Sequence, residues 1–121
     1  PAGSPIESGS PLTELVQELA LQGDEVIFEK TRPNAFAQTH LAAQLRERGC
    51  DGVVITGMKT QYCVDSTTRA ARDSGFDAVL IADGHTCPDT PSLKAEALIA
   101  HHNATLAGPF CRLVQARDWT F

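Results

Sequence analysis

The sequence predicts an α/β fold: a mainly parallel, open sheet covered by helices on both faces, in a three-layer, Rossmann-like α-β-α arrangement. Short apolar runs bounded by glycine or acidic residues recur along the chain, and stretches of helical periodicity separate them. Such alternation is typical of βαβ units with right-handed crossovers. Nearly continuous apolar runs favour strands that are covered on both faces, as in parallel sheets. Because 121 residues are the length of one domain, we expect a single α/β domain over residues 1–121.

The first half of the chain predicts two helices and one strand. Residues 1–10 are rich in Pro, Gly and Ser and predict a loop. Residues 11–22 carry leucine and valine at helical spacing between a Ser-Pro start and a closing glycine, which predicts a helix. Residues 25–30 (EVIFEK) predict a short strand, and a second helix begins at Asn34 and stops at Gly49.

The second half predicts three strands that alternate with two helices. Residues 52–57 (GVVITG) and 78–83 (AVLIAD) are apolar runs of buried-strand type, and residues 111–116 (CRLVQA) form a last strand. The polar stretch 63–74 predicts a helix that ends at a glycine. A further helix begins at Thr90-Pro91, with an apolar face that ends at Gly108-Pro109.

Composition excludes several classes of partner. The chain carries 10 Lys and Arg against 15 Asp and Glu, a formal charge of −5, which argues against nucleic-acid binding. No apolar run approaches the roughly 18 residues that span a bilayer, and the first ten residues lack a signal-peptide pattern. The cysteines lie far apart, without zinc-site spacing. We therefore expect a cytoplasmic protein with reduced thiols, no cofactor and no membrane association.

Chemistry is expected where parallel strands end, because ligands bind outside the carboxyl ends of such strands. Three segments qualify: Lys30, the stretch 57–63, and the stretch 83–87. In the second, a buried strand ends in glycine, a tight turn follows, and Cys63 stands where the next helix begins. Free N–H groups and the partial positive charge of a helix N-terminus favour thiolate over thiol and can hold an oxyanion. The alternative is a buried, inert thiol that serves as apolar filler.

Two side chains could activate this thiol. Lys30 ends a predicted strand and would lie beside the Cys63 turn if the two strands are near neighbours. The alternative is a solvated lysine at a strand end. His85 follows another predicted strand and could pair with Cys63 as a base, or be a loop histidine bonded to the backbone.

Three further side chains are candidates for substrate binding. Phe36 and Tyr62 flank the Lys30 and Cys63 positions and could form apolar pocket walls, and Gln61 could donate a hydrogen bond. Core packing for Phe36 and a surface turn for Gln61 are the alternatives.

The chain from residue 23 onward resembles the isochorismatase-like cysteine hydrolases, a family that includes nicotinamidase-like enzymes and N-carbamoyl amidases. The resemblance lies in EVIFEK followed by PNAFAQTHLAAQL, in the terminal strand, and above all in GVVITGMKTQYCVDSTTRAARDSGFDAVLIADG, residues 52–84. It implies that Cys63 is the nucleophile and Lys30 the active-site lysine. It also implies a cis peptide bond at Met58–Lys59 and an oxyanion hole formed by the N–H groups of Lys59 and Cys63.

The implied activity is hydrolysis of a small amide through a thioester on Cys63. The ether-cleaving isochorismatase branch needs no catalytic cysteine, so Cys63 favours amide cleavage. The resemblance also implies a homo-oligomer. It implies that no metal is bound, because the metal ligands of nicotinamidase-like members lie in a part of the family pattern that this chain does not match. An isochorismatase-type hydrolase, a Cys63–His85 dyad and a non-catalytic binding module are the alternatives.

One element of the family pattern has no counterpart in these 121 residues. The acid/base aspartate of the family ends its first strand in a segment of the form apolar-apolar-Asp-x-Gln, which does not occur here. In the family, the stretch that is missing here also supplies two strands of the sheet, which lie between the 25–30 strand and the 52–57 strand. We therefore expect the sequence to be part of a longer chain, with strand edges left unpaired in this part.

Overall fold

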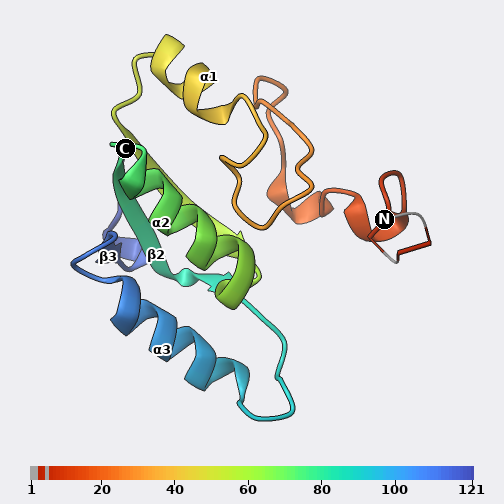
Figure 1. Ribbon diagram of the computed structural model, residues 1–121, viewed down its shortest axis with the longest axis vertical. Coiled ribbons are helices and arrows are strands. Elements are labelled where there is room, and N and C mark those ends of the chain that lie inside the picture. The colour runs from red at the N-terminus through yellow and green to blue at the C-terminus, as the bar shows by residue number, and fades with distance from the viewer. Residues whose placement is uncertain (1–2, 5) are drawn as a thin grey trace.

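The fold is built on a three-stranded parallel sheet with the strand order β1-β2-β3 (Figure 1). The computed structural model describes residues 3–4 and 6–121. The strands are β1 (Gly52–Met58), β2 (Asp77–Thr86) and β3 (Arg112–Val114). The helices are α1 (Leu41–Glu47), α2 (Asp65–Asp73) and α3 (Ala95–Leu106). An α/β fold with an open parallel sheet flanked by helices is thus confirmed.

The core lies around the central strand β2. Residues 78–82 of this strand are all buried, and the Leu80 side chain has no exposed surface. The buried core cluster joins β1, β2, α2 and the end of α3, and its members are Ile55, Val64, Ala71, Phe76, Ala78, Leu80, Leu106 and Cys111. The apolar run of β2 therefore forms the buried centre of the sheet, as its composition predicts, whereas β1 lies at the edge and only its Ile55 is buried.

A register shift near the carboxyl ends of β1 and β2 changes what lies opposite the end of β1. Ile55 pairs with Leu80, but two residues later Gly57 pairs with His85, so β2 has an inserted stretch. Gly84 belongs to this stretch, and a Cβ atom there would lie 2.8 Å from Ile81 Cγ2, so only glycine fits. The irregularity places His85 beside the last residues of β1.

The predicted helix over residues 11–22 is wrong. Only two short 3₁₀ turns form there, η1 (Pro11–Thr13) and η2 (Gln17–Leu19). The leucines and valine of the expected apolar face are exposed, with 71 % of Leu12 accessible to solvent. Because most helical stability in proteins comes from packing of an apolar face, the periodicity alone does not form a helix here.

The predicted strand over residues 25–30 is also wrong. The segment has no strand partner among the described residues, and Val26, Ile27 and Phe28 are exposed. A strand is defined by its ladder of hydrogen bonds, and β1 pairs only with β2 in the described sheet. Residues 6–40 instead form an irregular segment with two short 3₁₀ turns (Figure 1).

The remaining helices begin later than predicted. The helix expected from Asn34 starts at Leu41, after a series of bends and turns. The helix expected from Thr90 starts at Ala95, because Thr90 forms its own turn with Leu93 through two hydrogen bonds of 2.9 Å. Such local bonds from threonine compete with helix formation. Among the described residues no helix is long and apolar enough to cross a membrane.

Candidate active site

The turn that carries Cys63 leaves the carboxyl end of β1. Gly57 has a φ of 116°, in the left-handed region that favours glycine, and the Met58–Lys59 peptide bond is cis. A short π-helix, η3 (Thr60–Val64), follows and continues into α2. The Lys59 carbonyl accepts hydrogen bonds from the N–H groups of Tyr62 and Val64, at 3.1 and 3.2 Å. Cys63 therefore lies within the first helical turn after the strand and is half-buried.

The Lys30 ammonium is in direct contact with this thiol. Lys30 Nζ lies 3.3 Å from Cys63 Sγ and donates a second hydrogen bond to the Arg32 carbonyl at 3.0 Å. The two residues are 33 positions apart in sequence. An ammonium at this distance stabilises negative charge on the sulfur.

A loop, not a strand, holds Lys30 in place. The Ala35 N–H donates a 3.0 Å hydrogen bond to Thr67 Oγ1 on α2, and the Asn34 side chain accepts from the Phe36 N–H at 2.8 Å. The Phe36 ring stacks on Phe76 with 5.7 Å between centroids. Residues 34–36 are thus anchored on α2 and on the core, and the preceding segment reaches Cys63 from there.

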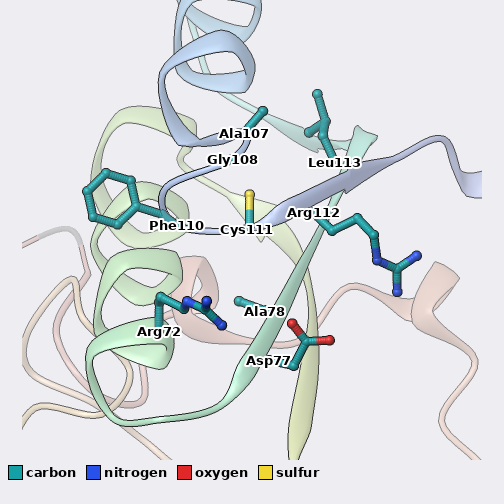
Figure 2. Close-up of a pocket in the computed structure, with 9 residues that line it drawn as sticks. All are labelled: Arg72, Asp77, Ala78, Ala107, Gly108, Phe110, Cys111, Arg112 and Leu113. Carbon is teal, nitrogen blue, oxygen red and sulfur yellow. The ribbon is translucent and has the colours of Figure 1, made fainter.

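A small cavity of about 170 Å³ opens at this contact. It is lined by Lys30, Ala35, Ile55, Thr56, Met58, Cys63, Val64 and Thr67. A larger hollow of about 510 Å³ lies at the opposite, amino end of β2 and β3, where Arg72, Phe110 and Cys111 line it (Figure 2). Because the larger hollow holds none of the predicted site residues, the candidate active site is the smaller cavity.

His85 is not paired with Cys63. The ring is buried, with Nδ1 2.9 Å from Thr60 Oγ1 and Nε2 2.8 Å from Asn103 Oδ1. Both nitrogens are occupied, so the alternative of a Cys63–His85 dyad is wrong for this structure. The hydrogen bonds of Thr60 and Asn103 to His85 could not be predicted from the sequence, since no local pattern connects a turn, a strand and a helix.

The three residues predicted to bind substrate lie near the site without lining its cavity. Phe36 packs against Phe76, and 54 % of Tyr62 is exposed. Gln61 Oε1 is buried and has no hydrogen-bond partner among the described residues. Their roles in substrate binding stay predictions.

The carboxylate nearest to Cys63 in sequence is engaged elsewhere. Asp65 accepts hydrogen bonds from Arg69 at 3.0 Å and from His102 Nδ1 at 3.2 Å. The hydrogen bond to Asp65 raises the pKa of the Arg69 guanidinium, as expected for an ion pair. Asp65 therefore fastens α2 to α3. Within the described part of the chain, no carboxylate contacts Cys63 Sγ or Lys30 Nζ.

The other thiols differ from Cys63 in their surroundings. All four cysteines are free; Cys50 is exposed, and Cys87 and Cys111 are buried. Burial raises the pKa of the Cys111 thiol, which keeps it protonated. In the described ranges no three His, Cys, Asp or Glu side chains cluster so as to hold a metal ion.

Known proteins match most of this chain. A family model described as the isochorismatase domain matches residues 2–108. The chain is 31 % identical over 119 residues to the secreted isochorismatase effector Isc1 of Verticillium dahliae, covering 98 % of this chain and 63 % of that protein. It is 35 % identical over 82 residues to the ureidoacrylate amidohydrolase of Variovorax paradoxus, covering 68 % of this chain and 32 % of that protein.

A solved structure of a related protein has a similar fold. The fold superposes on a crystal structure described as a putative isochorismatase from Burkholderia xenovorans with a TM-score of 0.88 and 28 % identity, covering 98 % of this chain and 60 % of that one. The chain thus spans less than two thirds of the length of each of these three proteins. Because one of them is named as secreted, the cytoplasmic location of this chain stays a prediction, as does its assembly into a homo-oligomer.

Proposed function

The chain belongs to the isochorismatase family, a family of hydrolases, and we propose that it is a cysteine hydrolase that cleaves the C–N bond of a small amide. The observation that carries this proposal is the 3.3 Å contact between Lys30 Nζ and Cys63 Sγ, two residues that line a small cavity. A thiol beside an ammonium, in the first turn of a helix, is the arrangement that produces a nucleophilic thiolate. A relative is named as an amidohydrolase, which supports amides as the substrate class.

The first step forms a thioester. The Cys63 thiolate attacks the amide carbonyl carbon, and the carbonyl electron pair moves to oxygen. The N–H groups of Lys59 and Cys63 are proposed to stabilise this oxyanion. When the intermediate collapses, the C–N bond breaks and the nitrogen takes up a proton and leaves as ammonia or an amine. Water then adds to the thioester, the C–S bond breaks, and a carboxylic acid and the thiol are formed.

Protonation of the leaving nitrogen is the demanding step for this chain. In the family resemblance an aspartate performs it, and the sequence holds no segment of that pattern. An ester with a good leaving group needs no such proton, whereas an amide does. We therefore expect the chain to cleave an activated ester faster, relative to an amide, than a hydrolase with a complete acid/base set.

Two alternatives have a specific basis. A non-catalytic binding module is consistent with the missing aspartate segment, and an isochorismatase-type hydrolase is consistent with the family match. Both predict that hydrolysis of amides and esters does not depend on the Cys63 thiol.

The test is a panel of small amides and matched p-nitrophenyl esters, assayed with the wild-type chain and its Cys63→Ala and Cys63→Ser variants. The expected result is hydrolysis that Cys63→Ala abolishes, with an acyl adduct on Cys63 detected by mass spectrometry after rapid acid quench. Cys50→Ala is the matched control, because it removes an exposed thiol away from the cavity. Turnover that survives in Cys63→Ala would refute the proposal.

A further inference from the structure

A line of polar groups, of which Thr60 and His85 are buried and Asn103 is half-buried, runs beneath the Cys63 turn. Thr60 has no exposed surface, and 6 % of His85 is exposed. Thr60 Oγ1 lies 2.9 Å from His85 Nδ1, and His85 Nε2 lies 2.8 Å from Asn103 Oδ1. Asn103 Nδ2 donates to the Ala82 carbonyl at 3.1 Å. The groups come from η3, β2 and α3, so the line connects three elements that are separate in sequence.

The chemistry of these groups fixes the direction of each hydrogen bond. The Asn103 amide nitrogen donates to a backbone carbonyl, so the amide oxygen faces His85 as an acceptor. His85 Nε2 must therefore carry a hydrogen, and in the neutral ring Nδ1 accepts from the Thr60 hydroxyl. Every polar atom in the line has a partner of the right kind. A fully satisfied buried network of this type holds its members in one arrangement.

We propose that Thr60, His85 and Asn103 are positioning residues that hold the turn from Gly57 to Cys63 in its active geometry. Thr60 adjoins Lys59, whose N–H is proposed to stabilise the oxyanion, and lies three residues before Cys63. Its side chain fastens the turn to β2 and, through His85, to α3. The effect on catalysis rests on the function proposed above, whereas the fastening of the turn does not.

The register shift between β1 and β2 is what makes the contact possible. It places His85 opposite Gly57, the residue at which the chain turns out of β1. With unbroken pairing, the residue two places beyond Leu80 would lie there instead, and that is Ala82, which has no side chain able to bond Thr60. The close approach at Gly84 belongs to the same irregularity.

The test uses a pair of substitutions that differ in one hydroxyl group. Thr60→Val keeps the shape of the side chain and removes the hydroxyl, whereas Thr60→Ser keeps the hydroxyl. Thr68→Val is the matched control, because Thr68 is equally buried but its hydroxyl bonds only the Val64 carbonyl of its own helical segment. Three quantities are measured: amide hydrogen exchange over residues 57–63, kcat and KM for ester or amide hydrolysis, and the rate of Cys63 alkylation by iodoacetamide.

In Thr60→Val we expect exchange over residues 57–63 to be about fivefold to tenfold faster, because one buried hydrogen bond no longer opposes opening. We expect kcat to fall about tenfold or more with KM within about twofold, since misplaced oxyanion donors affect the transition state. Alkylation forms no oxyanion and should change less than about twofold. Thr60→Ser should restore exchange and kcat, and Thr68→Val should leave both near wild type.

Three outcomes would overturn the inference: unchanged exchange over residues 57–63 in Thr60→Val, an equal change in Thr68→Val, or faster exchange with unchanged kcat. A wild-type chain without hydrolytic activity would refute only the proposed function. Amide hydrogen exchange over residues 57–63 would still show whether Thr60, His85 and Asn103 hold the turn. Where Thr60→Val does not fold, Asn103→Ala serves the same test, because Asn103 is half-buried at the far end of the line.

Discussion

Replacing Lys30 by glutamine removes the positive charge beside Cys63 and keeps most of the side-chain length. Over the 3.3 Å that separates Nζ from Sγ, an ammonium stabilises a thiolate by about 1.3 kcal/mol at the dielectric constant of bulk water. The bulk-water value is the appropriate one because Lys30 is exposed. An interaction of this size corresponds to about a ninefold factor in an equilibrium constant.

The rate of alkylation is expected to fall by less than this electrostatic factor. A thiolate that is no longer stabilised by a cation is more nucleophilic, with a Brønsted coefficient of about 0.4 to 0.5. We therefore expect iodoacetamide to react with Cys63 about threefold more slowly in Lys30→Gln than in wild type at pH 7. Iodoacetamide is neutral, so the substitution changes the thiolate and not the approach of the reagent. The modified fraction of Cys63 is followed by peptide mass spectrometry.

The matched control is Lys94→Gln, whose ammonium pairs with Asp89 at 2.7 Å, near the start of α3. It removes one charge from the chain without touching the site. An equal rate in wild type and Lys30→Gln, or an equal fall in Lys94→Gln, would refute the argument that the contact with Lys30 activates the thiol.

Three further outcomes follow from burial. Leu80→Ala should lower the free energy of unfolding in urea by about 2 to 5 kcal/mol, because Leu80 is fully buried in β2. Leu12→Ala, at an exposed position, should change it by less than about 0.5 kcal/mol. Similar losses at both positions would contradict the assigned core. In the native protein at pH 7, iodoacetamide should modify Cys63 first, then exposed Cys50, and Cys111 only after denaturation; equal rates for all three thiols would favour the non-catalytic alternative. Burial raises the pKa of the Cys111 thiol in the folded state. The stability that the protonated thiol contributes is therefore fully present below the pKa of the thiol in the unfolded chain, about 8.5, and is lost as the pH rises toward the higher pKa of the folded state. Urea unfolding at several alkaline pH values should therefore show a shallower decline in Cys111→Ala than in wild type, and identical slopes would contradict this assignment.

The parts of the fold that were predictable are those whose signal is local. Residues 52–57 and 78–83 are nearly continuous apolar runs, so their place in a parallel sheet follows from their composition, and the 78–82 stretch is buried as expected, although in β1 only Ile55 is buried. Residues 11–22 and 25–30 also carry the periodicity of a helix and a strand, yet neither forms. Both need a partner surface or ladder, and the described residues provide none to them. An apolar pattern in the sequence indicates which side chains a segment can bury. Tertiary contacts decide whether these side chains are buried.

The α/β class, the turn after β1 and the candidate nucleophile can be predicted from the sequence, because an apolar strand, a glycine and a cysteine follow one another over residues 52–63. The approach of Lys30 to that cysteine depends on tertiary contacts, since Lys30 arrives through a loop anchored on α2 and not through a neighbouring strand. The same holds for His85, which lies under the turn because the β1–β2 register shifts. Contacts between distant segments depend on register and packing, which the periodicity of a single segment does not encode.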